Sequence, residues 1–324
     1  MRTIDITAGS REAKQAYSLY EQACEEQDML HLPLTDREFE EKFLLPQEGM
    51  EKISLILEGG RAFASGVADR LTGKLFVTMA VTEKSSRRQG FGRAVLYELE
   101  KRLMELNGKK ELEVSFFNPV PLPWGITGDK KIEHPNTPGV DVRSDAYIFL
   151  KNCGYRDFAM QNSYYLELSD YKLPEKMAEK RLQLEKEGIT FTFYDPDVHT
   201  HMKEMLQDFQ NPLWEKELLK EPAPERGGRP VLVPVYQGRV CGFAGPLDVA
   251  KSKRGYFAGI GIDEAFRGKG LAKVLFCLLC EGLKERGAEF MTLFTGENNP
   301  ARNIYEAVGF SIIRSWADMR KRQL

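Results

Sequence analysis

Two short segments of the chain, 180 positions apart, share one pattern: an Arg, a Gly three residues later, and a small residue two beyond that Gly. They read SRRQGFG at residues 86–92 and FRGKGLA at residues 266–272. Each follows an apolar run typical of a strand and precedes a run with helical spacing. Such a recurrence indicates a duplicated unit, so the chain is expected to contain one fold twice.

The surroundings of the two loops repeat as well. Before each loop the sequence predicts a helix and three strands with hairpin turns, and after it a helix and a further strand. In the first half these are residues 11–24, 53–58, 61–70, 74–81, 93–106 and 111–117, and in the second half residues 197–209, 231–236, 239–247, 255–262, 271–286 and 289–295. The expected fold class is therefore α/β (α+β), with one unit of strands and helices in each half.

Domain boundaries follow from this repeat. Residues 1–168 form the expected N-terminal domain and residues 189–324 the C-terminal domain, with a charged, partly helical linker at residues 169–188. The first half also carries an insertion at residues 119–144, rich in Pro and Gly. Long irregular segments are usually functional or disordered. Two roles remain open for it: a lid over the acceptor site of its own or the neighbouring domain, and a plain packing or oligomer contact.

Composition argues against several classes of protein. A formal net charge of -2 over 324 residues gives no general attraction to nucleic acid or to an anionic membrane. No apolar run approaches the roughly 18 residues of a spanning helix. Five cysteines do not indicate a disulfide framework, and the cytoplasm is the expected location. No metal is expected, because His199 and His201 lack partners of ligand spacing, and Cys277 and Cys280 fall on an apolar helix as buried thiols.

The repeated loop itself suits an anion. A loop of small residues that opens a helix presents backbone N–H donors and the positive end of the helix dipole, which favour phosphate above all. Basic residues surround both copies: Arg87, Arg88 and Arg93 in the first, and Arg267, Lys269 and Lys273 in the second. Neither copy has the GK[ST] of a P-loop or the third Gly of a dinucleotide-binding loop.

In these loops the chain resembles the GCN5-related N-acetyltransferase (GNAT) superfamily, whose diphosphate loop has the pattern [Q/R]-x-x-G-x-[G/A]. The second half also matches the family pattern N-x-x-A-x-x-x-Y-x-x-x-G-F, with Asn298, Ala301, Tyr305, Gly309 and Phe310. The resemblance implies two tandem GNAT-like domains, each a mixed, mainly antiparallel sheet that opens between its fourth and fifth strands. It also implies acetyl-CoA as the co-substrate in that opening.

The resemblance assigns roles to residues. Tyr305 matches the general acid that protonates the departing CoA thiolate, and Asn298 matches a contact to pantetheine. The pantetheine is expected along the backbone near Ile260 and Ile262 or near Val81, with the oxyanion met by a backbone N–H around Ile260 to Ile262. The diphosphate is expected on Arg267, Gly268, Lys269, Gly270, Leu271 and Ala272, and on Arg87, Arg88, Gln89, Gly90, Phe91 and Gly92.

The first half departs from the family pattern. Its Leu150 aligns with Tyr305 and cannot donate a proton, and Tyr147 offers a hydroxyl only from a shifted place. Catalysis is therefore expected in the C-terminal domain, while the N-terminal domain binds CoA, shapes the acceptor cleft, or both. The reverse assignment stays open, because the first loop is intact. The general base is unassigned, with Asp263, Glu264 and Glu297 as candidates.

The expected activity is transfer of an acyl group, acetyl by default, from CoA to a primary amine of a small molecule or peptide by direct attack. Two alternatives stand beside it: a non-catalytic acyl-CoA-binding or regulatory protein, and a phosphate-binding interaction protein without CoA. The helix at 271–286 has an unusually wide apolar face. We therefore expect another domain or a second subunit of a homodimer to pack on its outer side, with Phe276 buried.

Overall fold

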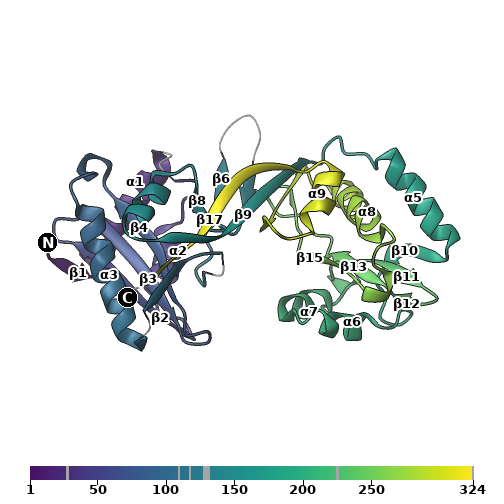
Figure 1. Ribbon diagram of the computed structural model, residues 1–324, viewed down its shortest axis with the longest axis horizontal. Helices are drawn as coiled ribbons and strands as arrows, with labels where there is room; N and C mark the ends of the chain where they lie inside the picture. Colours follow the sequence, from purple (N-terminus) through teal and green to yellow (C-terminus); the bar gives the residue numbers. More distant parts are fainter. Residues whose placement is uncertain (27–28, 109, 117, 127–131, 224–225, 323–324) are drawn as a thin grey trace. The chain divides into compact units, whose positions relative to one another are not determined.

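The structure is a computed structural model that describes residues 1–324 except 27–28, 109, 117, 127–131, 224–225 and 323–324. The chain forms two compact units, residues 1–163 with 314–324, and residues 164–313 (Figure 1). The expected boundary at residue 168 lies close to the end of the first segment. The expected C-terminal domain, residues 189–324, differs from the second unit at its end, because residues 314–324 belong to the first unit.

The first unit is a sheet between two helical layers. Its strand order is β1-β2-β3-β4-β5-β17-β9, with β4 and β5 parallel and the pairs from β1 to β4 and β5–β17 antiparallel. The elements are β1 (Thr3–Asp5), α1 (Arg11–Glu25), α2 (Asp36–Phe43), β2 (Met50–Leu57), β3 (Ala62–Asp69), β4 (Leu75–Thr82), α3 (Phe91–Asn107), β5 (Glu111–Val114), β6 (Trp124–Ile126), β7 (Ile132–His134), β8 (Val140–Asp141), α4 (Asp145–Asn152), β9 (Arg156–Glu167) and β17 (Ser311–Arg322).

Helical spacing explains the two layers of this unit. The side chains of α3 at Val95, Leu96, Leu99 and Leu103 are buried against β2, β3 and β4. On the opposite face, α1 and α2 bury a separate cluster that includes Phe39. A capping box, in which Thr35 and Glu38 bond reciprocally, starts α2.

The insertion is a packed part of the first unit. Its β6 pairs with β7, and its backbone bonds to the segment before α2: Leu32 N–H donates to Pro123 O and Gly125 N–H to Leu30 O, both at 2.9 Å. Trp124 is fully buried and meets Trp316 edge to face, with ring centroids 5.0 Å apart. These contacts favour the packing role among the two readings, although residues 127–131 of the insertion lie outside the described residues.

The second unit repeats the arrangement. Its sheet runs β10-β11-β13-β15, all antiparallel, and β14 pairs in parallel with β16. The elements are α5 (Glu175–Lys186), β10 (Ile189–Phe193), α6 (Met202–Asp208), α7 (Pro212–Leu218), β11 (Leu232–Tyr236), β12 (Arg239–Val240), β13 (Gly242–Gly245), β14 (Arg254–Gly255), β15 (Gly259–Ile262), α8 (Leu271–Glu285), β16 (Phe290–Gly296) and α9 (Arg302–Val308). The single strand expected at 255–262 is thus divided into β14 and β15.

The wide apolar face of α8 is covered within its own unit. Phe276 is fully buried, as are its neighbours along the helix, and α8 contacts α5, α9 and the sheet. Part of this face is covered by α5, which lies in the expected linker. Sequence periodicity had shown that a partner was needed but not which one.

Candidate functional site

The two loops adopt the same backbone conformation. Each begins with a short 3₁₀ helix, Lys84–Ser86 in the first unit and Glu264–Phe266 in the second. Two left-handed residues then follow with one residue between them: Arg88 (φ 62°) and Gly90 (φ 89°), against Gly268 (φ 79°) and Gly270 (φ 81°). Gly90 and Gly270 are the N-cap residues of α3 and α8. Turns of this kind form concave sites lined by backbone N–H groups.

The Arg of each motif stabilises the loop. Arg87 Nε donates to Thr82 O at 3.3 Å, and Arg267 Nε donates to Ile262 O at 3.1 Å. Both bonds run from the loop back to the last residue of the preceding strand. The guanidinium groups therefore tie the loop to its strand, a role that the sequence pattern alone does not distinguish from anion binding.

Both loops have room for an anion. A Cβ built on Gly90 or on Gly268 meets nothing within 4 Å. Neither α3 nor α8 has an acidic residue in its first turn. Exposed basic side chains surround both loops, Arg88 and Arg93 at the first and Lys269 and Lys273 at the second. The residues present thus fit a diphosphate group at either helix start.

The sheets open where the motif requires. Among the described residues of the first unit, β4 pairs with β5 at Leu75–Leu112 and Phe76–Glu113, and β4 continues to Thr82. In the second unit β16 pairs with β14, whereas β15 pairs with β13 on its other edge. The expected pantetheine residues lie on these strands: Val81 in β4, and Ile260 and Ile262 in β15. Phe117, which ends the expected fifth strand, lies outside the described residues.

Tyr305 lies on α9 within an aromatic cluster. Its side chain is 6% exposed, and its ring contacts Tyr164, Phe257, Phe276 and Phe310. Burial, with a smaller contribution from Tyr164, raises the pKa of Tyr305 to about 12. The phenol therefore keeps its proton at neutral pH and is available as a donor.

The other expected residues of the second half lie at the surface. Asn298 is exposed in the turn after β16, where nothing prevents contact with a ligand. Glu264 and Glu297 are also exposed. The structure gives neither carboxylate a buried partner that would make it a specific base.

Asp263, the third candidate base, is already engaged. Its Oδ2 accepts from Arg239 at 3.0 Å, and His201 Nε2 lies 3.0 Å from the same oxygen. Burial alone would raise the pKa of Asp263, but Arg239, the Ala265 N–H and His201 together hold it below its ordinary value. An ionised carboxylate held by an Arg is a weak proton acceptor, so Asp263 serves the structure of the loop.

The first unit does not reproduce this acid. Leu150, opposite Tyr305 in the alignment, is buried in the core beneath α3. The Tyr147 hydroxyl donates to Asp157 Oδ2 at 2.6 Å and accepts from Lys151 at 3.0 Å. The Tyr147 hydroxyl is therefore already hydrogen-bonded to Asp157 and Lys151. The first unit has an intact loop, but α4 offers no proton donor at the position that matches Tyr305.

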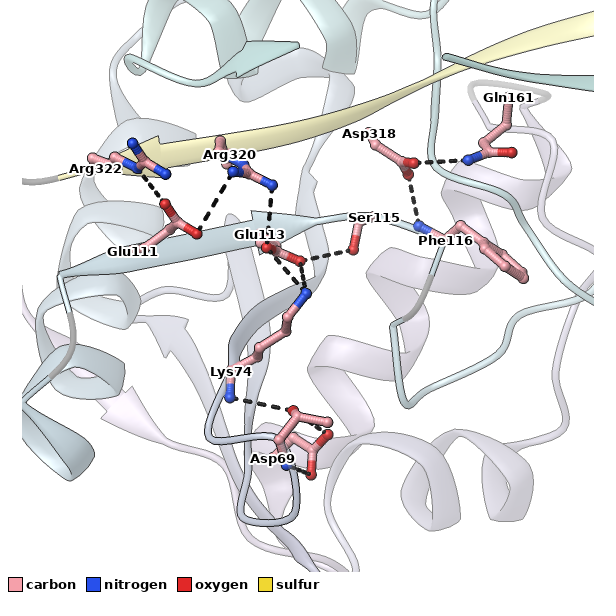
Figure 2. Close-up of polar contacts among 11 residues, drawn as sticks. Asp69, Lys74, Glu111, Glu113, Ser115, Phe116, Gln161, Asp318, Arg320 and Arg322 are labelled. Carbon is pink, nitrogen blue, oxygen red and sulfur yellow. Dashed lines mark hydrogen bonds and ion pairs between the residues drawn. The ribbon is translucent and has the colours of Figure 1, made fainter. Parts of the chain in front are cut away.

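A buried polar network in the first unit was not expected from the sequence. Figure 2 shows Glu113 of β5 between Lys74 Nζ at 3.1 Å and Arg320 of β17, with Ser115 donating to it. Asp318 accepts from Phe116 N–H at 2.7 Å and from Gln161 at 3.0 Å. The alternation of Asp318, Arg320 and Arg322 indicates a strand, but nothing in it identifies β5 as the neighbour.

Other sequence features have structural roles. Cys277 and Cys280 are fully buried, and burial raises the pKa of both thiols. Among the described residues, no three His, Cys, Asp or Glu side chains are grouped as a metal site requires. No helix in the described part of the chain is long and apolar enough to cross a membrane.

Comparison with known proteins supports this reading. Residues 198–310 match the family model of the acetyltransferase (GNAT) family. No curated protein matches the chain. Similar solved structures include a GCN5-related N-acetyltransferase from Sphaerobacter thermophilus, at 16% identity and TM-score 0.61 over 99% of this chain and 95% of that one. A tandem GNAT protein from the clavulanic acid biosynthesis pathway is 14% identical, with TM-score 0.59 over 99% and 98%.

A third similar structure belongs to a much longer protein. It is the GCN5-related glucosamine N-acetyltransferase region of a fungal multi-domain GH3 β-N-acetylglucosaminidase, at 16% identity and TM-score 0.65. The likeness covers 98% of this chain but only 38% of that one. These likenesses confirm the expected fold over both halves, and the residues that match the family model lie within the second unit.

Proposed function

We propose that the protein transfers an acetyl group from acetyl-CoA to a primary amine and that the second unit, whose residues 198–310 match the model of the acetyltransferase (GNAT) family, catalyses the transfer. One observation carries the proposal: the second unit alone combines the anion-binding loop at residues 267–272 with a buried, protonated Tyr305 on α9. Acetyl-CoA supplies the activated thioester, and the acceptor is an amine of a small molecule or peptide.

The residues of the second unit have distinct tasks in this mechanism. The loop N–H groups and the start of α8 hold the diphosphate. Backbone N–H groups of β15 around Ile260 and Ile262 stabilise the oxyanion that forms when the neutral amine attacks the thioester carbonyl. As the carbon–sulfur bond breaks, the Tyr305 hydroxyl gives its proton to the departing thiolate. The nitrogen of the new amide releases its extra proton to solvent, and the tyrosinate takes a proton back from solvent. Since attack is direct, no nucleophilic Ser or Cys is needed.

The first unit has a different role in the proposal. Its loop has the same two left-handed residues and the same Arg-to-strand bond, so it binds acyl-CoA as well. Leu150 in place of the acid makes it a supporting, non-catalytic site. In this proposal one chain has both functions: the second unit catalyses, and the first unit binds acyl-CoA without catalysing.

Replacement of Tyr305 tests the assignment. Tyr305→Phe removes only the hydroxyl, so kcat for thiol release with a panel of amines should fall roughly 100- to 10,000-fold with KM for acetyl-CoA little changed. Tyr164→Phe is the matched control, because its hydroxyl bonds to Glu306 at 3.0 Å in the same aromatic cluster. It should retain turnover.

The reverse assignment gives a different pattern. If Tyr305→Phe keeps full turnover while Arg88→Glu in the first loop abolishes it, the first unit catalyses. If wild-type protein binds CoA but releases no thiol with any amine, the protein is a non-catalytic acyl-CoA-binding protein. Calorimetry with ATP as a competitor separates CoA recognition from general phosphate binding.

A further inference from the structure

Lys180 of α5 reaches the start of α8. Its Cε lies 3.2 Å from the position that a Cβ on Gly270 would occupy. Gly270 is the N-cap residue of α8 and the second left-handed residue of the loop. The side chain of a linker helix therefore lies against the helix start at which the anion is proposed to bind.

The packing of α5 fixes this approach. Leu184 of α5 is fully buried in the core that contains Leu271 and Val274 of α8, and Met177 packs against the same core. Lys180 is three residues after Met177 and four before Leu184, so helical spacing puts it on the same face of α5. The stem of Lys180 therefore lies against the start of α8, while its ammonium bonds to Gln183 of α5.

The ammonium is free to change its partner. Lys180 Nζ bonds to Gln183 Oε1 at 3.0 Å, an exposed contact within α5. Exchanging such a neutral, solvated partner for a phosphate oxygen replaces an ordinary hydrogen bond with a charge-assisted one. A Lys on a flexible stem makes this exchange by side-chain rotation alone.

The first loop lacks this contact. A Cβ on Gly90, which matches Gly270, meets nothing within 4 Å. The cations near that loop include Arg88 and Arg93 of the loop and α3, and Arg61, whose guanidinium lies 5.3 Å from the ring centroid of Phe91. At Gly270, unlike at Gly90, a cationic side chain from a separate helix therefore lies against the helix start.

We propose that Lys180 binds the diphosphate of acyl-CoA in the second unit, a role that rests on the function proposed above. The diphosphate then lies between the N–H groups at the start of α8 and the ammonium of α5. The linker helix becomes part of the acyl-CoA site, and the second unit holds its ligand more tightly than the first.

Binding measured in the full-length chain tests this role. The background carries Arg88→Glu and Arg93→Glu, which repel a diphosphate from the first loop, so calorimetry with CoA reports the second. There, Lys180→Ala should raise the Kd for CoA about tenfold and Lys180→Arg should restore most of the affinity. Lys176→Ala, an exposed Lys one turn earlier on α5, should have no effect. Unchanged thermal unfolding of each variant excludes a loss of structure.

Shortened ligands locate the contact. Dephospho-CoA keeps the diphosphate and lacks the 3′-phosphate, so the Lys180→Ala penalty should persist with it and should disappear with pantetheine, which has neither. A penalty lost with dephospho-CoA would place Lys180 at the 3′-phosphate and overturn the proposal. Equal affinities of Lys180→Ala and Lys176→Ala would overturn it while the acyltransferase assignment stands. Absence of any CoA binding in this background would overturn both.

Discussion

His31 shows how one residue can link pH to the stability of the first unit. It lies in the segment that bridges to Trp124 of the insertion, and its Nδ1 is buried without a hydrogen-bond partner among the described residues. Burial lowers the pKa of His31 to about 4, below the 6.5 of an unperturbed His. The folded chain therefore keeps this ring neutral across a range in which the unfolded chain binds a proton.

The stability of the wild-type chain should consequently fall with acidification. The contribution of His31 is complete above pH 6.5 and is lost as the pH falls toward 4, because only the unfolded state gains the proton in that window. Relative to His31→Gln, which does not titrate, the wild type should lose on the order of 2 kcal/mol between pH 7 and pH 5. Urea unfolding at both pH values measures this. If the unfolding free energy of the two proteins changes equally between pH 7 and pH 5, His31 binds protons equally in the folded and unfolded states.

At the scale of elements, the paired loops provide an internal comparison. Arg88 and Gly268 hold the same left-handed position, with φ of 62° and 79°. A non-Gly residue there is disfavoured by about 1–2 kcal/mol, whereas Gly adopts it freely. The first loop therefore carries strain that the second does not, and it gains a cation near its anion site.

Exchanging these two residues should separate strain from charge. Gly268→Arg should destabilise the second unit by about 1 kcal/mol, and Arg88→Gly should stabilise the first by a smaller amount, since Gly also adds freedom to the unfolded chain. Arg88→Gly should at the same time weaken CoA binding at the first loop. Thermal unfolding and calorimetry on the same samples measure the two effects. A first unit destabilised by Arg88→Gly would mean that Arg88 makes contacts that outweigh its strain.

Local elements were predictable because their signals are local. The strand, loop and helix around Gly90 and Gly270 each depend on a few neighbouring residues. The role of Tyr305, which the family pattern suggests from its spacing, stays a prediction. The break between β14 and β15 was not predictable, since Trp214 causes part of it. Its indole Nε1 donates to Ala258 O at 3.0 Å, and a Cβ on Gly259 would lie 2.4 Å from that nitrogen. Such contacts come from residues distant in sequence.

At the scale of the whole chain, the repeat predicted two halves. It did not predict that the C-terminal segment of the second half belongs to the first unit. Residues 314–324 belong to the first unit, where β17 pairs with β5 through Met319–Val114 to Arg322–Glu111. Asp318 and Arg320 complete the polar network of Glu113 there. A strand that is continuous in sequence with the second half gives no local sign of this pairing, because only its alternation is visible.

The exchanged strand makes the C-terminal residues a determinant of N-terminal stability. Trp316 is 1% exposed, contacts Trp124 edge to face, and donates from Nε1 to Ser163 Oγ at 2.9 Å. Trp316→Ala should destabilise the first unit by about 3–5 kcal/mol, through a cavity and an unpaired Ser163. Ile312→Ala, on the same strand but 46% exposed, is the control and should change stability little.

Hydrogen exchange distinguishes the units in this test. In Trp316→Ala, amides of β3 to β5, which are more than 170 residues earlier in the chain, should exchange faster, while those of α8 and β13 keep their protection. If the exchange of α8 and β13 accelerates and that of β3 to β5 does not, β17 stabilises the second unit and the strand exchange is wrong. If hydrogen exchange becomes faster only for the amides of β17 itself, the first unit is stable without the packing of this strand.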